Sequence, residues 1–334
     1  MIPQLFPDFD NRDSERHVLT IGNFDGVHRG HQHLLGLVVS AANANEAQSG
    51  ALTFDPLPLE VLRPEVSPPR LTSTADRLQL IRACGIDSVI PISFTREIAS
   101  LEAPQFVEQV VNALRPVEIV VGSDFAFGRD RSGNVDVLRL LGALFSYTVT
   151  VVDRIGDGTQ DFSSSRVRAG LANGDVRSAA EILGRPYFLR GTVVVGQRRG
   201  RELGFPTANL AEMGKLSIPA DGIYAAMTQT QSGSALIPSM VYVGTNPTFN
   251  EKARVVEVNL LGFDGDLYGT GLVVLFADRV RGDQRFENPA QLISQMHRDR
   301  ERTIGLIGAL SSDWPGQALR EILKIGNGAL TGDR

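Results

Sequence analysis

The sequence predicts a two-domain α/β protein, in which a parallel sheet with helices is followed by an antiparallel barrel or sandwich. The chain has 334 residues, which corresponds to about two domains at ~150 residues each. From residue 17 to about 152, apolar strand-like runs alternate with amphipathic helical runs, a pattern typical of a parallel sheet with helices on both faces. Beyond residue 188, strand-like runs follow one another with Gly/Pro turns and little helix between them, which favours an antiparallel architecture.

Composition and charge narrow the class of protein. The net charge of −5 argues against a nucleic-acid binder, which would normally carry a basic domain. The single cysteine, Cys84, rules out an intramolecular disulfide framework and fits a reducing compartment. No run approaches the ~18 apolar residues of a membrane span, and residues 1–8 do not resemble a signal peptide. We therefore expect a soluble cytoplasmic protein that binds neither nucleic acid nor membrane.

The first half is expected to alternate strands and helices. The expected strands are 17–21, 51–54, 86–94, 117–121 and 147–152, and the expected helices are 34–42, 76–84, 104–114 and 135–145. Ligands of such sheets bind at the carboxyl ends of the strands. The segment 22–31, which follows the first strand, would lie at that edge.

A change of pattern near residue 184 marks the expected domain boundary. Two short helices, 167–172 and 176–183, come before Gly184-Arg185-Pro186, which interrupts the pattern. The expected strands beyond it are 188–195, 222–230, 236–243, 254–261 and 271–277, and a final helix is expected over 289–310. The sequence thus predicts domains at residues 1–184 and 185–334, the second ending in a helix that packs on the barrel.

The segment Gly-Asn-Phe-Asp-Gly-Val-His-Arg-Gly-His, residues 22–31, combines features of an anion site. Its glycines lie where a strand turns into a helix, so backbone N–H groups and the positive end of the helix can face a phosphate. His28 and His31 are three apart and share one helix face, where two imidazoles can donate hydrogen bonds to a phosphoryl group. Alternatively, they are solvent-facing histidines at a helix start, although His-x-Gly-His is rare by chance in a chain of this composition.

This motif resembles the signature of the adenylyltransferase module of bacterial bifunctional riboflavin kinase/FAD synthetases, within the nucleotidylyltransferase superfamily. The resemblance implies a Rossmann-like parallel sheet and an ATP-binding loop formed by Gly22, Asn23, Phe24, Asp25 and Gly26. It also implies that His28 and His31 stabilise charge during adenylyl transfer.

Two further elements of the first half are similar to family motifs. Val-Gly-Ser-Asp-Phe-Ala-Phe-Gly, residues 121–128, implies flavin binding by Asp124, Phe125 and Phe127, although ordinary core packing explains the two aromatics equally well. Ser-Ser-Ser-Arg-Val-Arg, residues 163–168, implies phosphate binding by Ser164 and Ser165 and charge stabilisation by Arg168. Taken without the family, the serines would be a helix N-cap. Leu57 stands where some members carry a histidine, so that any polar role there is absent.

The second half carries motifs that resemble those of riboflavin kinases. A basic glycine loop, residues 196–204, contributes Gly196, Gly200 and Gly204 to expected phosphate binding and runs into Gly-Phe-Pro-Thr-Ala-Asn. Thr207 and Asn209 offer hard oxygen ligands for Mg²⁺ shared with ATP phosphates, instead of a plain Pro-Thr turn.

Glu257 is the expected general base of the kinase. Strand alternation places it on the face opposite Val256 and Val258, where a glutamate is ordinarily just solvated. The family has Val-Glu at this point, and the resemblance implies that Glu257 takes a proton from the primary hydroxyl of the flavin. Gly262 stands where many relatives have aspartate, for which we expect a structural consequence only.

The resemblance implies two consecutive ATP-dependent steps with Mg²⁺ as cofactor: riboflavin to FMN, then FMN to FAD and pyrophosphate. Two alternatives are nucleotidyl transfer to another phosphorylated acceptor and a flavin-binding regulator without catalysis. The downstream kinase motifs argue against the first, and the intact motif residues argue against the second. The oligomeric state is left open.

Overall fold

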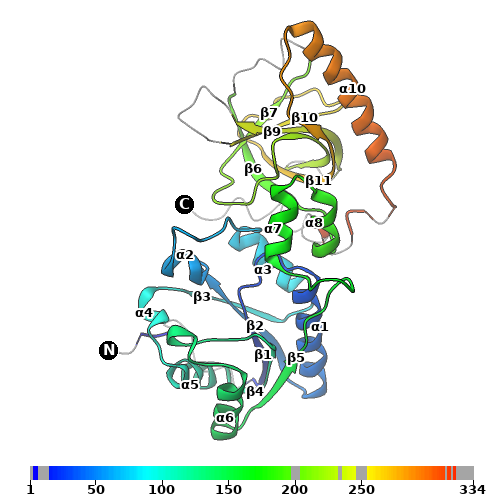
Figure 1. The fold of residues 1–334 in the computed structure, drawn as a ribbon. Helices are drawn as coiled ribbons and strands as arrows, with labels where there is room; N and C mark the ends of the chain where they lie inside the picture. Colours follow the sequence, from blue (N-terminus) through cyan, green and yellow to red (C-terminus); the bar gives the residue numbers. More distant parts are fainter. Residues whose placement is uncertain are drawn as a thin grey trace. The chain divides into compact units, whose positions relative to one another are not determined.

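The structure is a computed structural model that describes residues 3–6, 15–196, 204–231, 235–245, 254–312, 314–316 and 319–320. Its contacts divide the chain into two compact units (Figure 1). The first unit comprises Met1–Pro68 and Thr72–Ser163, and the second comprises Pro69–Leu71 and Ser164–Arg334. None of the described helices is long and apolar enough to cross a bilayer.

The first unit is built on a five-stranded parallel sheet. Its strands are β1 (His17–Ile21), β2 (Gln48–Asp55), β3 (Ser88–Ser93), β4 (Pro116–Gly122) and β5 (Thr148–Val152). They lie in the order β3-β2-β1-β4-β5. The strand order therefore reverses between β1 and β4, and the carboxyl ends of these two neighbours form the crevice in which such sheets bind ligands.

Helices cover both faces of this sheet, as the alternating pattern predicts (Figure 1). They are α1 (Arg29–Ala44), α2 (Pro58–Leu62), α3 (Thr74–Arg82), α4 (Arg96–Ala99), α5 (Ala103–Leu114) and α6 (Val135–Phe145). Leu19 and Ile21 of β1 pack in one cluster with Phe106 of α5 and Leu138 of α6, whereas α1 lies on the side that Val18 faces. Period-two alternation in the strand explains this division.

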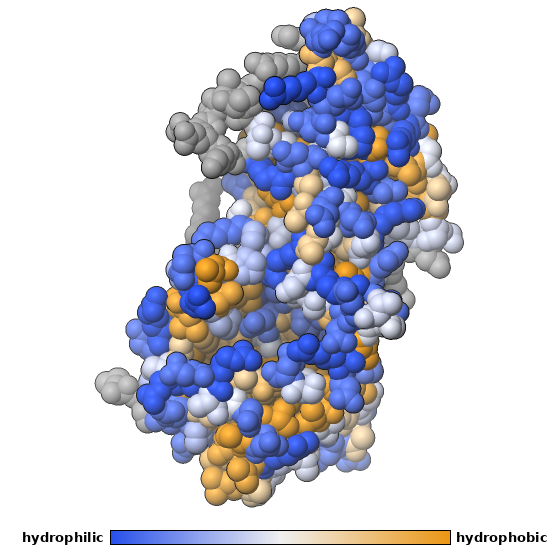
Figure 2. Space-filling view, viewed as in Figure 1, coloured by the Kyte–Doolittle hydropathy of each residue, from blue (hydrophilic) through white to orange (hydrophobic). Residues whose placement is uncertain are grey.

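Helix α6 buries only one side. Leu138 is fully buried, but Leu140 and Leu144 are 73% and 71% exposed. Figure 2 shows the resulting apolar area at the lower edge of the view, where Figure 1 has α6. The helix is thus anchored by its inner leucines and presents an apolar outer side.

The second unit is a closed antiparallel barrel with a long helix against it. The strands are β6 (Phe188–Val194), β7 (Ala208–Ala211), β8 (Gly222–Thr230), β9 (Ile237–Thr245), β10 (Arg254–Leu260) and β11 (Gly271–Gly282). They close in the order β10-β7-β6-β11-β8-β9. Helix α10 (Pro289–Gly308) packs Met296 against a cluster that includes Phe205, Ile223 and Met240. The expected barrel and terminal helix are therefore confirmed.

Helices α7 (Ser164–Ala172) and α8 (Val176–Leu183) group with the barrel, so the contacts divide the chain before α7. The sequence places the change later, at Gly184. The reason is packing: α7 lies on α8, α8 lies on β11, and Ala220 N–H donates to Leu171 O at 2.8 Å. A short segment of the first half joins the same unit, because Arg70 exchanges backbone hydrogen bonds with Lys215 and Ser217 at 2.8 and 2.7 Å.

Candidate active sites

The side chain of Thr72 helps to fix the loop after β1 from inside. Thr72 donates through its N–H and its hydroxyl to Asp25 Oδ1, at 3.2 and 3.3 Å, and its Oγ1 accepts from Gly26 N–H at 3.3 Å. Asp25 is 3% exposed, so its carboxylate is part of the loop's frame. Of the expected ATP-binding residues, Phe24 is buried like Asp25, Gly22 is half-buried, and Asn23 alone is exposed.

His28 and His31 form a stacked pair at the start of α1. Their ring centroids are 3.7 Å apart with an interplanar angle of 21°. His28 is the N-cap residue, and its Nδ1 accepts from His31 N–H at 3.4 Å. Phe24 meets the His31 ring edge to face at 5.3 Å. The spacing predicted a shared face, and the structure shows ring contact.

Gly30 provides the space for the His28 ring. A Cβ added at Gly30 would lie 3.1 Å from both Cε1 and Nδ1 of that imidazole, which is tighter than ordinary contact. The missing side chain of Gly30 therefore makes room for one of the two catalytic candidates.

The surroundings of His31 disfavour its charged form. Burial, together with the neighbouring His28, holds the pKa of His31 well below its ordinary value. Its Nδ1 is buried and has no hydrogen-bond partner within the described residues. A phosphate bound beside this imidazole would favour its charged form and so raise its pKa.

The expected flavin-binding residues follow β4, the neighbour of β1 at the switch point. Asp124 is exposed and forms an ion pair with Arg154 at 2.5 Å. Phe125 is half-buried and stacks on Phe127 at 5.3 Å, and Phe127 is 8% exposed and packs against Phe106 in the core. Phe127 is therefore a core residue. The side chain of Asp124 is exposed and that of Phe125 is partly exposed at this edge of the sheet.

Ser164, Ser165 and Arg168 lie in the first two turns of α7 and belong to the second unit. Arg168 Nε donates to Pro69 O at 2.7 Å. This bond ties α7 to the segment Pro69–Leu71 of the same unit. The role of these three residues in phosphate binding stays a prediction from the sequence.

The kinase motif and the expected base meet on adjoining strands of the barrel. Asn209 of β7 lies directly opposite Glu257 of β10 in the antiparallel register. Thr207 Oγ1 donates to Glu257 Oε2 at 3.1 Å, across fifty residues of sequence. Val256 and Val258 are fully buried, whereas Glu257 is half-buried. The side of β10 that alternation assigned to the solvent therefore carries a cluster of three oxygen-bearing side chains.

The loop before this cluster is shaped around Asn209. A Cβ at Gly196 would lie 2.1 Å from Asn209 Nδ2, so only glycine lets the amide rest there. Gly204 has φ +81° and opens the Pro-Thr turn. Gly200 lies outside the described residues, and its expected phosphate contact stays a prediction.

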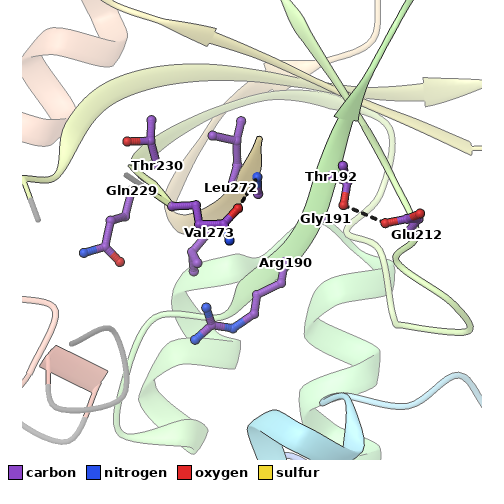
Figure 3. A pocket seen from close by; sticks show the side chains of 10 residues that line it. Arg190, Gly191, Thr192, Glu212, Gln229, Thr230, Leu272 and Val273 are labelled. Atoms are coloured by element: carbon purple, nitrogen blue, oxygen red, sulfur yellow. Dashed lines mark hydrogen bonds between the residues drawn. The ribbon is translucent and has the colours of Figure 1, made fainter. Parts of the chain in front are cut away.

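A pocket on the barrel lies apart from these residues. It is lined by Arg190 and Thr192 of β6, Gln229 of β8 and Val273 of β11, and Thr192 donates to Glu212 at 2.6 Å (Figure 3). None of Thr207, Asn209 and Glu257 lines it. The three residues expected for the kinase therefore lie outside this pocket.

Sequence reasoning did not find two residues that support the sites. Thr72 is not among the predicted site residues, although its side chain holds Asp25 and Gly26 in the loop after β1. Asn259 is not among them either, although its Nδ2 donates to Pro206 O, beside the kinase motif, at 2.7 Å. Period-two spacing was the one available signal for Asn259, and Thr72 offered none.

Comparisons with known proteins agree with this layout. The family model described as FAD synthetase matches residues 10–166, and the model described as riboflavin kinase matches residues 183–306. The bifunctional riboflavin kinase/FMN adenylyltransferase of Escherichia coli is 36% identical over 84% of this chain and 90% of its own length. The protein of that name from Bacillus subtilis is 31% identical over 87% of this chain and 93% of its own. A crystal structure titled as a macrolide-efflux protein from Streptococcus pneumoniae superposes with a TM-score of 0.80 at 31% identity, covering 89% of this chain and 97% of that one.

The fold and the two clusters define a nucleotide-dependent transferase built from two units. The chain belongs to the bifunctional riboflavin kinase/FMN adenylyltransferase family. It phosphorylates riboflavin to FMN and adenylylates FMN to FAD, with ATP as the donor in this family. The expected two-step activity is confirmed, and the readings as a regulator or as a transferase with another acceptor are set aside.

Proposed function

We propose that residues 185–334 carry the riboflavin kinase site at Thr207, Asn209 and Glu257, and that residues 1–184 carry the adenylyltransferase site at His28 and His31. The observation that carries the kinase assignment is the hydrogen bond from Thr207 to Glu257 at 3.1 Å, with Asn209 opposite Glu257 in the ladder. Three residues that resemble a kinase motif in sequence form one cluster in space.

In the kinase step Glu257 accepts a proton from the primary hydroxyl of riboflavin. Its carboxyl group accepts the hydrogen bond from Thr207 and has the capacity to accept a second one from the substrate hydroxyl. Removing that proton as the oxygen attacks the γ-phosphorus of ATP, while the bond to the leaving ADP breaks, is general-base catalysis. The remainder of the rate enhancement comes from positioning and charge stabilisation, as in other phosphoryl transfers.

The donor set fits Mg²⁺. The described residues hold no cluster of three or more His, Cys, Asp or Glu that could form an all-protein metal cage. Mg²⁺ instead commonly takes one or two protein oxygens together with water and ATP phosphates. The Thr207 hydroxyl can donate to Glu257 and still offer a lone pair, and Asn209 offers its amide oxygen. These two residues would hold the ion, which would neutralise phosphate charge.

In the adenylyltransferase step the FMN phosphate attacks the α-phosphate of ATP and pyrophosphate leaves. The nucleophile is already an anion, so this step needs no general base. His28 and His31 would donate to the oxygens on which negative charge increases. Gly22, Asn23, Phe24, Asp25 and Gly26 are assigned to ATP binding by resemblance. The N–H groups of Gly22 and Gly26 donate within the protein, to Leu52 O and Thr72 Oγ1, so these two glycines would shape the loop that receives the nucleotide.

The remaining flavin-binding and phosphate-binding residues are assigned by their resemblance to the family motifs. Asp124 and Phe125 would contact the flavin, and Phe127 would support Phe125 by stacking. Phosphate contacts are assigned to Ser164, Ser165, Arg168, Gly196, Gly200 and Gly204. The single cysteine and the use of ATP are consistent with a cytoplasmic enzyme of small-molecule substrates.

The test follows both products in one reaction. Purified chain is incubated with riboflavin, ATP and Mg²⁺, and riboflavin, FMN and FAD are separated by chromatography over time, for the wild type, Glu257→Gln and His28→Ala. We expect FMN before FAD in the wild type, no FMN from Glu257→Gln, and FMN that accumulates without FAD from His28→Ala. FMN formation by Glu257→Gln at the wild-type rate would overturn the kinase assignment.

A further inference from the structure

Asn259 lies two residues beyond Glu257 on β10 and therefore on the same face of the strand. Its side chain is buried, with 6% of the residue exposed. Its Nδ2 donates to the carbonyl oxygen of Pro206 at 2.7 Å, a contact between residues fifty-three apart in sequence. A buried amide donor directed at one backbone carbonyl is a specific contact, because an unpaired carbonyl there would lose its full solvation.

The carbonyl of Pro206 belongs to the peptide bond that leads into Thr207. One strand face thus holds two successive points of the motif: Asn259 holds the Pro206 carbonyl, and Glu257 accepts from the Thr207 hydroxyl at 3.1 Å. With the peptide plane fixed at one end and the hydroxyl at the other, Thr207 has little freedom to turn away from the base.

The backbone ladder cannot supply this restraint. The pairing of β7 with β10 runs over Leu210–Val256, Asn209–Glu257 and Ala208–Val258 and ends there. Pro206, two residues earlier, has no N–H with which to extend the ladder. The side chain of Asn259 instead donates to the carbonyl of Pro206. Strand β10 thus contacts the motif one residue beyond Val258, the last residue that pairs with β7.

We propose that Asn259 is a positioning residue of the kinase: it fixes the Pro206–Thr207 peptide and thereby sets the Thr207 hydroxyl between Glu257 and the metal-bound phosphates. The inference rests on the proposed kinase site. This positioning role requires a neutral hydrogen-bond donor at residue 259. A carboxylate of the same shape would face the Pro206 carbonyl with a like partial charge and stand beside the charge of Glu257 on one face.

The test compares variants of the full chain that differ in the donor. Asn259→Asp keeps the shape and removes the N–H, Asn259→Ala removes the group, and Asn259→His retains an N–H at a similar reach. Ser239→Ala is the matched control: Ser239 is fully buried on β9, and its hydroxyl donates to Ile237 O at 3.0 Å, away from the motif. FMN adenylylation by the same molecules reports whether the chain is otherwise intact.

Riboflavin phosphorylation is measured as a function of both MgATP and free Mg²⁺. For Asn259→Asp and Asn259→Ala we expect kcat/KM for MgATP to fall at least tenfold and the Mg²⁺ concentration for half-maximal rate to rise. The KM for riboflavin should change little. Asn259→His should recover most of the activity, and Ser239→Ala should match the wild type per folded molecule.

Two results would overturn the proposal. One is an unchanged Mg²⁺ and MgATP dependence in Asn259→Asp. The other is a parallel loss in Asn259→Asp and Ser239→Ala that follows only the folded fraction, since that is a structural effect. If Asn259→Asp does not fold, Asn259→Ala and Asn259→His still decide between these outcomes. Thr207→Ala and Glu257→Gln are run alongside, because full activity in both would show that the site assignment fails and not the role of Asn259 alone.

Discussion

The imidazoles of His28 and His31 stack at 3.7 Å, and Gly30, between them in sequence, leaves the space that the first ring occupies. The pair is therefore a preassembled unit at the N-terminus of α1. Its geometry depends on the absence of a Cβ at one position, which makes the arrangement open to a small and specific perturbation.

Gly30→Ala should impair adenylylation without unfolding the protein. The new methyl would lie 3.1 Å from the His28 ring and displace it. We expect FAD formation from FMN to fall by roughly 10²-fold, the scale of losing one preorganised donor. Gly36→Ala is the control in the same helix, because nothing lies within 4 Å of a Cβ there, and it should stabilise α1 by about 1 kcal/mol. Equal rates for the two variants would contradict the role of the stacked pair.

The stability of the first unit should decrease in mild acid because of His31. Its folded-state pKa lies well below the value of 6.5 that applies in the unfolded chain. The unfolded state therefore binds the proton first, and stability falls as the pH decreases through 6.5 toward the lowered pKa, by up to about 1.4 kcal/mol per pH unit. Urea unfolding at pH 7.5 and 5.5 should show a smaller pH effect in His31→Gln than in wild type. His33→Gln, at an exposed position, should keep the wild-type dependence.

Removing the Thr207 hydroxyl should weaken the kinase selectively. Thr207→Val keeps the shape and loses both the bond to Glu257 and the oxygen proposed for Mg²⁺. We expect phosphorylation of riboflavin to fall by about 10²–10³-fold, with more Mg²⁺ needed for half-maximal rate. Thr207→Ser should remain within a few-fold of wild type. Similar Mg²⁺ titrations for Val and Ser would show that the hydroxyl is not a ligand.

A buried ion pair anchors α10 to the barrel. Arg281 Nε and Nη2 bind Asp299, which is 2% exposed and also accepts from Gln295 at 2.8 Å. Asp299→Ala leaves the Arg281 cation without its partner, and we expect a loss of about 3 kcal/mol in the stability of the second unit, measured by urea unfolding. Asp136→Ala breaks an exposed pair with Arg139 and should have little effect. A barrel equally stable in both variants would contradict the anchoring role.

Elements with a strong local pattern were predictable from sequence. The helices at 135–145 and 176–183 and the strand at 222–230 begin and end where the pattern places them, because apolar periodicity and capping agree there. The strand β7, Ala-Asn-Leu-Ala, was not predicted, since it is short and has no β-branched residue; only pairing with β6 and β10 defines it.

The sequence identifies most of the candidate site residues, whereas the contacts between them depend on the tertiary fold. The three-residue spacing of His28 and His31 predicts a shared face, but ring stacking depends on the turn geometry before α1. The contact between Thr207 and Glu257 links positions fifty residues apart and follows only from barrel closure. The support from Thr72 to Asp25 is likewise a tertiary contact without a local signal.

The most direct test of two separate sites on one chain is complementation between two inactive variants. Each of His28→Ala and Glu257→Gln is incubated alone with riboflavin, ATP and Mg²⁺, the two are then mixed, and FAD is measured by chromatography. We expect no FAD from either variant alone, FMN from His28→Ala, and FAD from Glu257→Gln when FMN is supplied. The mixture should form FAD, because FMN released by one chain is adenylylated by the other. Failure of Glu257→Gln to adenylylate supplied FMN, with the chain folded, would contradict it, because the two reactions would then depend on the same residues.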